Sequence, residues 1–306
     1  MTNFTLNNHL QYTIGGRLWG SRESPTEKYA VTVGAVDPDQ YRISSYEEEL
    51  RRTADCVYKE FGKDLVVFLS GGTDSEIVIN NFKSIGIKPK CATIKLSHDF
   101  NKNDVTEAIR LATEYDLPHE IIEFDVQDFF ASGKAKAFGE EIQCTQVTYL
   151  MVYHTILQLG APAVMGGETL LTRHVTKNDS NWYYTLRENE DASAMRFTNK
   201  YNVPLVNEWF AYTPELLLYY LEYPRIQSLV TERYNYKLTS VSSKNSILKE
   251  LCPYITPKKK THGFESLLAF NYEAYKAIGR GQIKRLEHSL DGIYYNDVVD
   301  QLRADL

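Results

Sequence analysis

Short runs of apolar residues alternate with longer stretches in which apolar positions recur every three or four residues. The short runs have strand length, and the most apolar of them fits a strand that is buried on both faces. They lie at residues 65–69 (LVVFL), 91–94 (CATI), 119–124 (HEIIEF) and 163–165 (AVM). The stretches with helical spacing lie at 77–85, about 103–115 and about 142–159. This alternation with short loops predicts an α/β fold, in which a parallel sheet has helices on both faces.

The N-terminal part of the chain has a different pattern. Residues 1–43 contain short strand candidates, two of which flank Gly15-Gly16, a pair that suits a tight hairpin turn. Ser45 and Glu48 then form a capping-box pair, which predicts a helix that starts near residue 45 and stops at Gly62.

The alternation also stops after residue 170. The polar segment 171–202 contains two strand candidates, at 182–187 and 194–198, and the chain from Thr213 onward has helical character. The predicted units are 1–62, N-terminal strands and a helix, and 63–306, a domain with the inserted polar segment 171–202 and a helical C-terminal part.

Composition is that of an ordinary globular protein, since 43% of the 306 residues are hydrophobic and 24% are charged. The net charge of −6 disfavours nucleic acid or anionic lipid as a partner of the whole chain. The four cysteines include no CxxC pair, which favours reduced thiols. No apolar stretch approaches the roughly 18 residues of a membrane span, and the N-terminus lacks the pattern of a signal peptide. We therefore expect a cytoplasmic protein with no membrane contact.

The segment SGGTDS, residues 70–75, follows the most apolar run and precedes a helix. A Gly-Gly turn at such a junction lets backbone N–H groups and the positive end of the helix converge on an anion. The hydroxyls of Ser70, Thr73 and Ser75 can add donors, and Asp74 suits a Mg²⁺ ion that bridges to phosphate. The chain has no GxxxxGK[ST] segment of the Walker type. A plain glycine turn with a serine helix cap is the alternative, but the position of the whole motif favours a phosphate site.

This segment resembles the SGGxDS pyrophosphate loop of the PP-loop ATP pyrophosphatases. That superfamily includes asparagine synthetase, NAD synthetase, GMP synthetase and tRNA-modifying enzymes. The resemblance implies a HUP-like, Rossmann-like PP-loop core with a five-stranded parallel sheet. It also implies cleavage of ATP to AMP and pyrophosphate with Mg²⁺. The loop alone does not distinguish between the branches.

Three further stretches favour the synthetase domain of asparagine synthetase. Residues 104–122 are similar to a helix and the following strand of that family. Residues 164–171 (VMGGETLL) resemble a degenerate form of its Gly-rich acidic loop, and residues 244–264 resemble its C-terminal signature.

The resemblance also implies roles for individual residues. Asp74 matches the aspartate that binds Mg²⁺, and Glu168 aligns with a second acidic, metal-binding position. Lys260 matches the lysine that stabilises the leaving pyrophosphate and the acyl-transfer transition state. Ile94 and Lys95 align with backbone groups that contact adenine. Pyrophosphate binding falls on Ser70, Gly71, Gly72, Thr73 and Ser75.

Simpler interpretations stay open for several residues. Glu168 also fits a solvated acid after a glycine turn, and Lys260 fits a solvated basic run. Lys244 fits a surface lysine at a helix start better than a phosphate ligand. His154 lies on an apolar helix face, which is typical of a core histidine, whereas His262 lies in a predicted loop.

The function that the resemblance implies is an AMP-forming ligase, which adenylates a carboxylate and transfers the acyl group to ammonia or an amine. The polar segment, with Arg173, His174, Arg187 and Arg196, is the candidate for recognition of the acid. Full-length asparagine synthetases carry an N-terminal glutaminase domain with a cysteine after the initiator methionine. Here Thr2 occupies that position, and residues 1–62 are too few for such a domain. We therefore expect a separate glutaminase or ammonia donor.

Two other functions remain open from the sequence. One is a PP-loop enzyme that modifies RNA or a nucleobase, although the missing CxxC pair and the net charge of −6 disfavour it. The other is a nucleotide-binding protein that has lost turnover, which the shortened Gly-Gly-Glu loop at 166–168 would explain.

Overall fold

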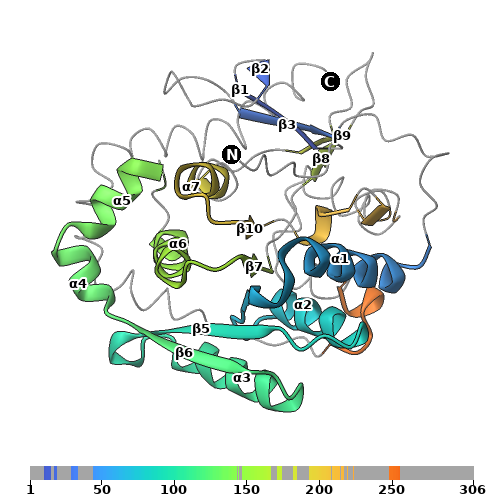
Figure 1. The fold of residues 1–306 in the computed structure, drawn as a ribbon, viewed down its shortest axis with the longest axis horizontal. Helices are drawn as coiled ribbons and strands as arrows, with labels where there is room; N and C mark the ends of the chain where they lie inside the picture. Colours follow the sequence, from blue (N-terminus) through green and yellow to red (C-terminus); the bar gives the residue numbers. More distant parts are fainter. Residues whose placement is uncertain are drawn as a thin grey trace, which may run out of the picture.

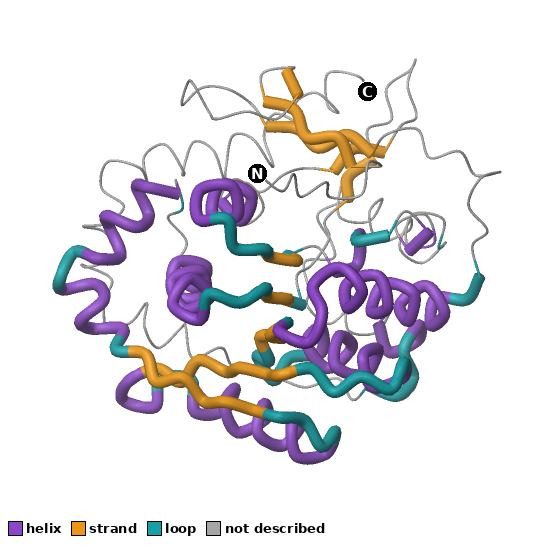
Figure 2. Tube along the Cα trace, viewed as in Figure 1, coloured by secondary structure: helices purple, strands orange, loops and turns teal. Residues whose placement is uncertain are grey.

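Two sheets, one parallel and one antiparallel, organise the part of the chain that the structure describes (Figure 1). The computed structural model describes residues 10–14, 17–18, 29–33, 44–142, 144, 147–166, 171–173, 182–184, 193–207, 209–213, 215–216, 219, 223 and 248–255. Helices surround the parallel sheet, and the antiparallel strands form a separate group (Figure 2). The prediction of an α/β fold with a parallel sheet is confirmed.

The parallel sheet has five strands in the order β10-β7-β4-β5-β6, and every neighbouring pair runs parallel. The strands are β4 (Val66–Phe68), β5 (Lys90–Leu96), β6 (His119–Phe124), β7 (Ala163–Met165) and β10 (Leu205–Val206). β4 is central, since Val67 pairs with Cys91 of β5 on one side and with Val164 of β7 on the other. The chain runs outward from β4 through β5 to β6 and then returns to form β7 and β10, so the order reverses between β4 and β7.

Helices cover both faces of this sheet, as predicted. The α-helices are α1 (Tyr46–Phe61), α2 (Thr73–Ser84), α3 (Lys102–Glu114), α4 (Val126–Ala131), α5 (Lys134–Ile142), α6 (Val147–Leu159) and α7 (Ser193–Tyr201). The 3-10 helices are η1 (Gly62–Asp64), η2 (Ser97–Asp99) and η4 (Trp209–Ala211). α1 and α2 lie on one side of the parallel strands, and α6 and α7 on the other (Figure 1). Within the described residues, no helix has the length and apolar character that crossing a membrane requires.

The first helix begins at the predicted cap. The Ser45 hydroxyl oxygen accepts a hydrogen bond from the N–H of Glu48 at 3.2 Å, and the helix ends before Gly62, whose φ is +70°. These features depend on residues close together in the chain, which explains why the sequence pattern predicted them.

Two hydrophobic cores, one on each face of the sheet, follow from the alternation of side chains along the central strand. Leu65, Val67 and Leu69 pack in the core that contains α1, α2 and α3. Val66 and Phe68 pack in the opposite core with α4, α5, α6 and α7. The continuous apolar run at 65–69 is therefore explained by burial on both faces, as predicted.

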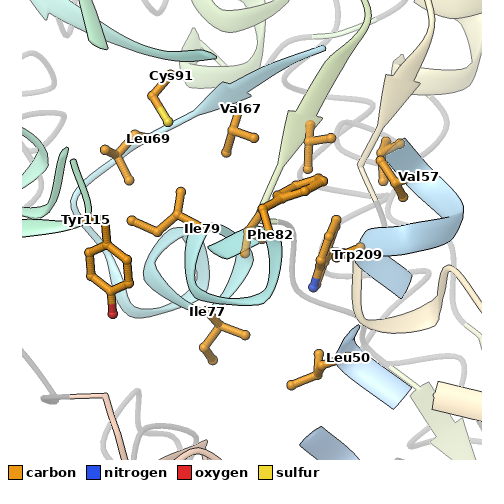
Figure 3. Packing of buried hydrophobic residues seen from close by; sticks show 14 of the residues in the cluster. Leu50, Val57, Val67, Leu69, Ile77, Ile79, Phe82, Cys91, Tyr115 and Trp209 are labelled. Atoms are coloured by element: carbon orange, nitrogen blue, oxygen red, sulfur yellow. The ribbon is translucent and has the colours of Figure 1, made fainter. Parts of the chain in front are cut away.

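The contact between α2 and β4 is tightly packed. Val67 and Leu69 point from the strand toward Ile79 and Phe82 of α2 (Figure 3). The Phe82 ring packs against Trp209 with centroids 5.4 Å apart and a tilt of 50°. Burial of each apolar side chain of this size stabilises the folded state by about 1.5–3 kcal/mol. This packing fixes α2 against β4.

The antiparallel sheet joins two segments that are far apart in the sequence. Its strands are β1 (Leu10–Ile14), β2 (Arg17–Leu18), β3 (Tyr29–Val33), β8 (Leu171–Arg173) and β9 (Trp182–Tyr184), in the order β2-β1-β3-β9-β8. The predicted hairpin is present, since Ile14 pairs with Arg17. Val31 pairs with Tyr184, so the N-terminal strands and the inserted polar segment form one sheet.

Two elements differ from the prediction. The predicted strand at 194–198 is wrong, because these residues lie in α7. Ala194 and Phe197, three residues apart, are buried on one helix face, and Phe197 stacks on Tyr153 of α6 with ring centroids 5.3 Å apart. The helix predicted at about 142–159 corresponds to α6 (Val147–Leu159), and α4 and α5 before it were not predicted. At residues 194–198 the apolar spacing is too short to distinguish a strand from a helix, and packing of α7 against α6 favours the helix.

Candidate functional site

The segment SGGTDS lies at the reversal point of the parallel sheet. It follows β4 and leads to α2 on one face, whereas the chain after the neighbouring β7 leads by way of α7 on the other face to β10. Connections that leave two adjacent strands toward opposite faces create a crevice at the carboxyl ends of those strands. The structure therefore places the segment where α/β proteins bind their ligands.

The turn itself is held by its own hydroxyl groups. Gly71 has a φ of +71°, which glycine adopts without strain. The Ser70 hydroxyl oxygen accepts from the N–H of Gly72 at 3.4 Å, and the buried Ser75 hydroxyl donates to the Gly72 carbonyl at 2.9 Å. The two serine hydroxyl oxygens lie 3.3 Å apart. Ser70 is exposed, so its side chain lies at the surface of the turn, whereas Ser75 supports the turn from inside.

The start of α2 faces this turn. Gly72 is the N-cap residue and has no side-chain oxygen that could accept from the first-turn N–H groups. Thr73 and Asp74 are the first two residues of the helix, and both are partly exposed. The positive end of the helix dipole, on a helix of 12 residues, is therefore directed at the turn. This arrangement is suited to binding an anion.

Two glycines are needed because backbone approaches the loop closely from both sides. A Cβ atom on Gly71 would lie 2.6 Å from the carbonyl oxygen of Asp104 and 2.9 Å from the nitrogen of Ala108, both in α3. A Cβ atom on Gly166, which follows β7, would lie 2.8 Å from the nitrogen of Ser75. The loop is therefore enclosed between α3 and the end of β7. The VMGGE pattern in the sequence did not indicate the second contact.

Asp74, the predicted magnesium ligand, lies in the first turn of α2. Its carboxylate oxygen Oδ1 is buried, while the residue as a whole is partly exposed beside the turn. The described residues contain no cluster of three or more His, Cys, Asp or Glu side chains that could hold a metal ion. One carboxylate beside a turn that is suited to an anion fits Mg²⁺, because this ion is commonly held by one or two carboxylates together with substrate phosphates.

Ile94 and Lys95 lie where β5 extends past the end of β4. The two strands pair as far as Phe68 and Ala92, whereas β5 continues to Leu96. The Lys95 ammonium donates to Glu123 at 2.9 Å, and this hydrogen bond raises the pKa of the Lys95 side chain. The predicted adenine contacts are therefore close to the loop in the sheet, although the Lys95 side chain is directed toward β6.

A residue that the sequence reasoning missed, Asn101, binds the end of β5. Its side-chain nitrogen donates to the Ile94 carbonyl at 2.7 Å, and its side-chain oxygen accepts from the Leu96 N–H at 2.9 Å. The carboxamide thus pairs with the strand as a neighbouring strand would. No local pattern indicated this role, because an asparagine at the start of a helix, here α3, is ordinarily explained as a helix cap.

The other predicted site residues divide into two groups. His154 lies among the rings of Phe124, Phe129 and Phe138, at centroid distances of 6.0, 4.9 and 5.7 Å, and burial lowers the pKa of its imidazole. This is the core environment that its position on an apolar helix face predicted. Arg173 belongs to β8, and Arg196 is partly exposed on α7. The predicted roles of Glu168, Lys260, Lys244, His174, Arg187 and His262 fall outside the described residues.

Substituting Gly166 with alanine is expected to displace the end of β7 from the start of α2, because the new Cβ overlaps backbone atoms of α2. We expect a loss of about 1–3 kcal/mol in the free energy of unfolding, measured by urea denaturation. Gly139→Ala in α5 is the matched control, since its Cβ would lie 2.6 Å from the Cys144 carbonyl oxygen, far from the loop in the fold. Faster hydrogen exchange at residues 70–75 is expected in Gly166→Ala alone. Equal exchange there in both variants would contradict the contact.

Comparison with known proteins gave similar solved structures but no family. No protein-family model matches the chain, and no curated protein matches it. A predicted subunit of tRNA methyltransferase from Methanocaldococcus jannaschii is 17% identical with a TM-score of 0.32, and the match covers 65% of this chain and 94% of that one. NMN synthetase from Francisella tularensis is 13% identical with a TM-score of 0.32, covering 73% of this chain and 99% of that one. NH3-dependent NAD synthetase from Campylobacter jejuni is 15% identical with a TM-score of 0.31, covering 74% and 100%.

Proposed function

We propose that this protein is an ATP-dependent, AMP-forming ligase of the PP-loop kind. In the proposed reaction a carboxylate is adenylated, and its acyl group is then transferred to ammonia or an amine. The observation that carries the proposal is the Ser70-Gly71-Gly72 turn at the reversal point of the sheet, with the uncapped start of α2 behind it. The resemblance of residues 70–75 to the SGGxDS loop supports pyrophosphate as the anion.

The proposed chemistry uses the turn to stabilise the leaving group. The substrate carboxylate attacks the α-phosphorus of ATP, and negative charge develops on pyrophosphate. Backbone N–H groups of the turn and the positive end of α2 would bind that charge, and groups oriented before the reaction starts stabilise it most effectively. Mg²⁺, when bound at Asp74, supplies neutralisation of the phosphate oxygens.

Three further roles in the proposal rest on the resemblance to asparagine synthetase. Glu168 is proposed as a second ligand of the metal, and Lys260 as the group that stabilises pyrophosphate and the acyl-transfer intermediate. In an asparagine-synthetase-like reaction, transfer of the acyl group to ammonia or an amine gives an amide. Ile94 and Lys95 are proposed to contact adenine through the backbone of β5. Because the Ile94 carbonyl already accepts from Asn101, adenine would share or replace that hydrogen bond.

The proposal is tested by pyrophosphate release from Mg·ATP across a panel of amino acids and other carboxylates, each with ammonium or a simple amine. We expect AMP and pyrophosphate in equal amounts, and only when one class of acid is present. ADP and phosphate as products would contradict the proposal. Binding of Mg·ATP without turnover over the whole panel would instead favour a nucleotide-binding protein, and turnover only with RNA would favour a nucleic-acid-modifying enzyme.

A further inference from the structure

A hydrogen-bonded chain of side chains reaches the root of the turn from the neighbouring strands. Thr93, on β5, is 4% exposed, and its hydroxyl donates to the carbonyl of Leu69 at 2.6 Å. Leu69 is the last residue before Ser70, and its own N–H donates to the Ala92 carbonyl at 2.8 Å. The strand pairing ends here, so a side chain now holds the carbonyl from which the turn departs.

His119, the first residue of β6, continues this chain. Its Nε2 atom lies 2.8 Å from the Thr93 hydroxyl oxygen. Thr93 has a single hydroxyl hydrogen, and the Leu69 carbonyl can only accept, so His119 must be the donor in the second contact. Burial lowers the pKa of the His119 imidazole, which favours the neutral ring. The contact with Thr93 then requires the ring proton on Nε2. The donors then run in one direction, from His119 to Thr93 to Leu69, and such chains strengthen each member.

Holding the Leu69 carbonyl also orients the turn. The peptide unit between Leu69 and Ser70 is planar and trans, so fixing the carbonyl direction fixes the opposite direction of the Ser70 N–H. Gly71 follows and is in turn confined by α3. The turn is therefore constrained at its root by side chains and at its apex by helix backbone.

We infer that Thr93 and His119 are positioning residues, which hold the Leu69 carbonyl and thereby preorganise the turn at residues 70–72 for an anion. This inference rests on the proposed function for the identity of that anion, pyrophosphate. The role of Thr93 and His119 in holding the Leu69 carbonyl does not depend on the proposed function. The two residues stay behind the loop and contact neither nucleotide nor acid in this scheme.

The first test measures hydrogen exchange in the full chain without ligand. Thr93→Val has nearly the same shape but lacks the hydroxyl, and we expect faster exchange of the amides at 70–75. Thr93→Ser, which restores the hydroxyl, is expected to restore protection. Thr155→Val is the matched control, because Thr155 is a buried threonine whose hydroxyl donates to the Met151 carbonyl at 2.8 Å on the opposite face of the sheet. Unchanged exchange at 70–75 in Thr93→Val, or an equal change in Thr155→Val, would overturn the inference.

His119→Leu provides a second variant at a half-buried position, in case Thr93→Val does not fold. It removes the donor to Thr93 but leaves the hydrogen bond from the Thr93 hydroxyl to the Leu69 carbonyl, so we expect a smaller acceleration of exchange at 70–75. His119→Gln retains an N–H donor at the end of its side chain and should lie closer to the unchanged protein. Identical exchange in the unchanged chain and in His119→Leu would remove His119 from the assignment.

The second test measures the affinity for Mg·pyrophosphate by calorimetry. We expect about tenfold weaker binding in Thr93→Val, as for the loss of one hydrogen bond that orders a site. Thr93→Ser and Thr155→Val should stay within about twofold of the unchanged chain. If the unchanged chain does not bind Mg·pyrophosphate, the proposed function fails, and hydrogen exchange alone decides whether the positioning role stands.

Discussion

Replacing Asp74 with alanine is expected to abolish AMP formation from Mg·ATP while the fold stays intact. Asp74 is the only predicted metal-binding carboxylate among the described residues, and it lies in the first turn of α2 beside the turn at residues 70–72. Without Asp74, the proposed Mg²⁺ ion would lose its ligand from α2, and the leaving pyrophosphate would lose the cation that neutralises it. We therefore expect a fall in rate of about a thousandfold or more. The loss of a first-turn acid should cost only about 0.3–1 kcal/mol in stability. Acid-dependent release of pyrophosphate and thermal unfolding measure the two effects separately.

Asp128→Ala is the matched control for this variant. Asp128 is also an acid in the first turn of a helix, α4, but it lies on the opposite face of the sheet and pairs with Lys134 at 2.8 Å in an exposed ion pair. Its removal should change stability by about 0–1 kcal/mol and leave the rate unchanged. If Asp74→Ala turned over at the same rate as Asp128→Ala, Asp74 would have no role in holding the metal.

Gly71→Ala is expected to be the most damaging small substitution in the loop. Two independent effects add here. The φ of +71° costs a residue with a Cβ about 1–2 kcal/mol, and the Cβ would overlap the backbone of α3 at Asp104 and Ala108. Hydrogen-bonded helix backbone cannot move aside cheaply, so we expect a total loss of about 2–5 kcal/mol in the free energy of unfolding. Urea denaturation measures this loss, and binding of Mg·ATP should disappear with the displaced turn.

Gly133→Ala separates the two effects. Gly133 has a φ of +77°, but a Cβ there would meet nothing within 4 Å. This variant therefore carries the backbone strain without the overlap, and it should lose only about 1–2 kcal/mol and leave nucleotide binding unchanged. An equal loss in the two variants would mean that α3 does not confine the turn.

The secondary structure of the core could be predicted because it depends on local patterns. The run at 65–69 alternates between two cores, the cap at Ser45 needs only the next turn of helix, and the Gly-Gly turn lies between a strand and a helix that both have clear periodicity. The segment 194–198 has no such periodicity over its short length. In α7 its Phe197 stacks on the ring of Tyr153, which is remote in the sequence.

The sequence by itself determined the parallel α/β core, the position of the turn at residues 70–72 within it, and the residue types of that turn. All of these follow from hydrophobic periodicity and from the backbone freedom of glycine. Only the tertiary structure decided what supports the turn. Gly166, just after β7, approaches the start of α2, and Thr93, backed by His119, bonds to the Leu69 carbonyl at the root of the turn. Asn101 binds the neighbouring end of β5. The tertiary structure also decided that the N-terminal strands pair with β9 of the inserted segment. Such contacts join residues that share no local pattern, and they exist only once the strands are side by side.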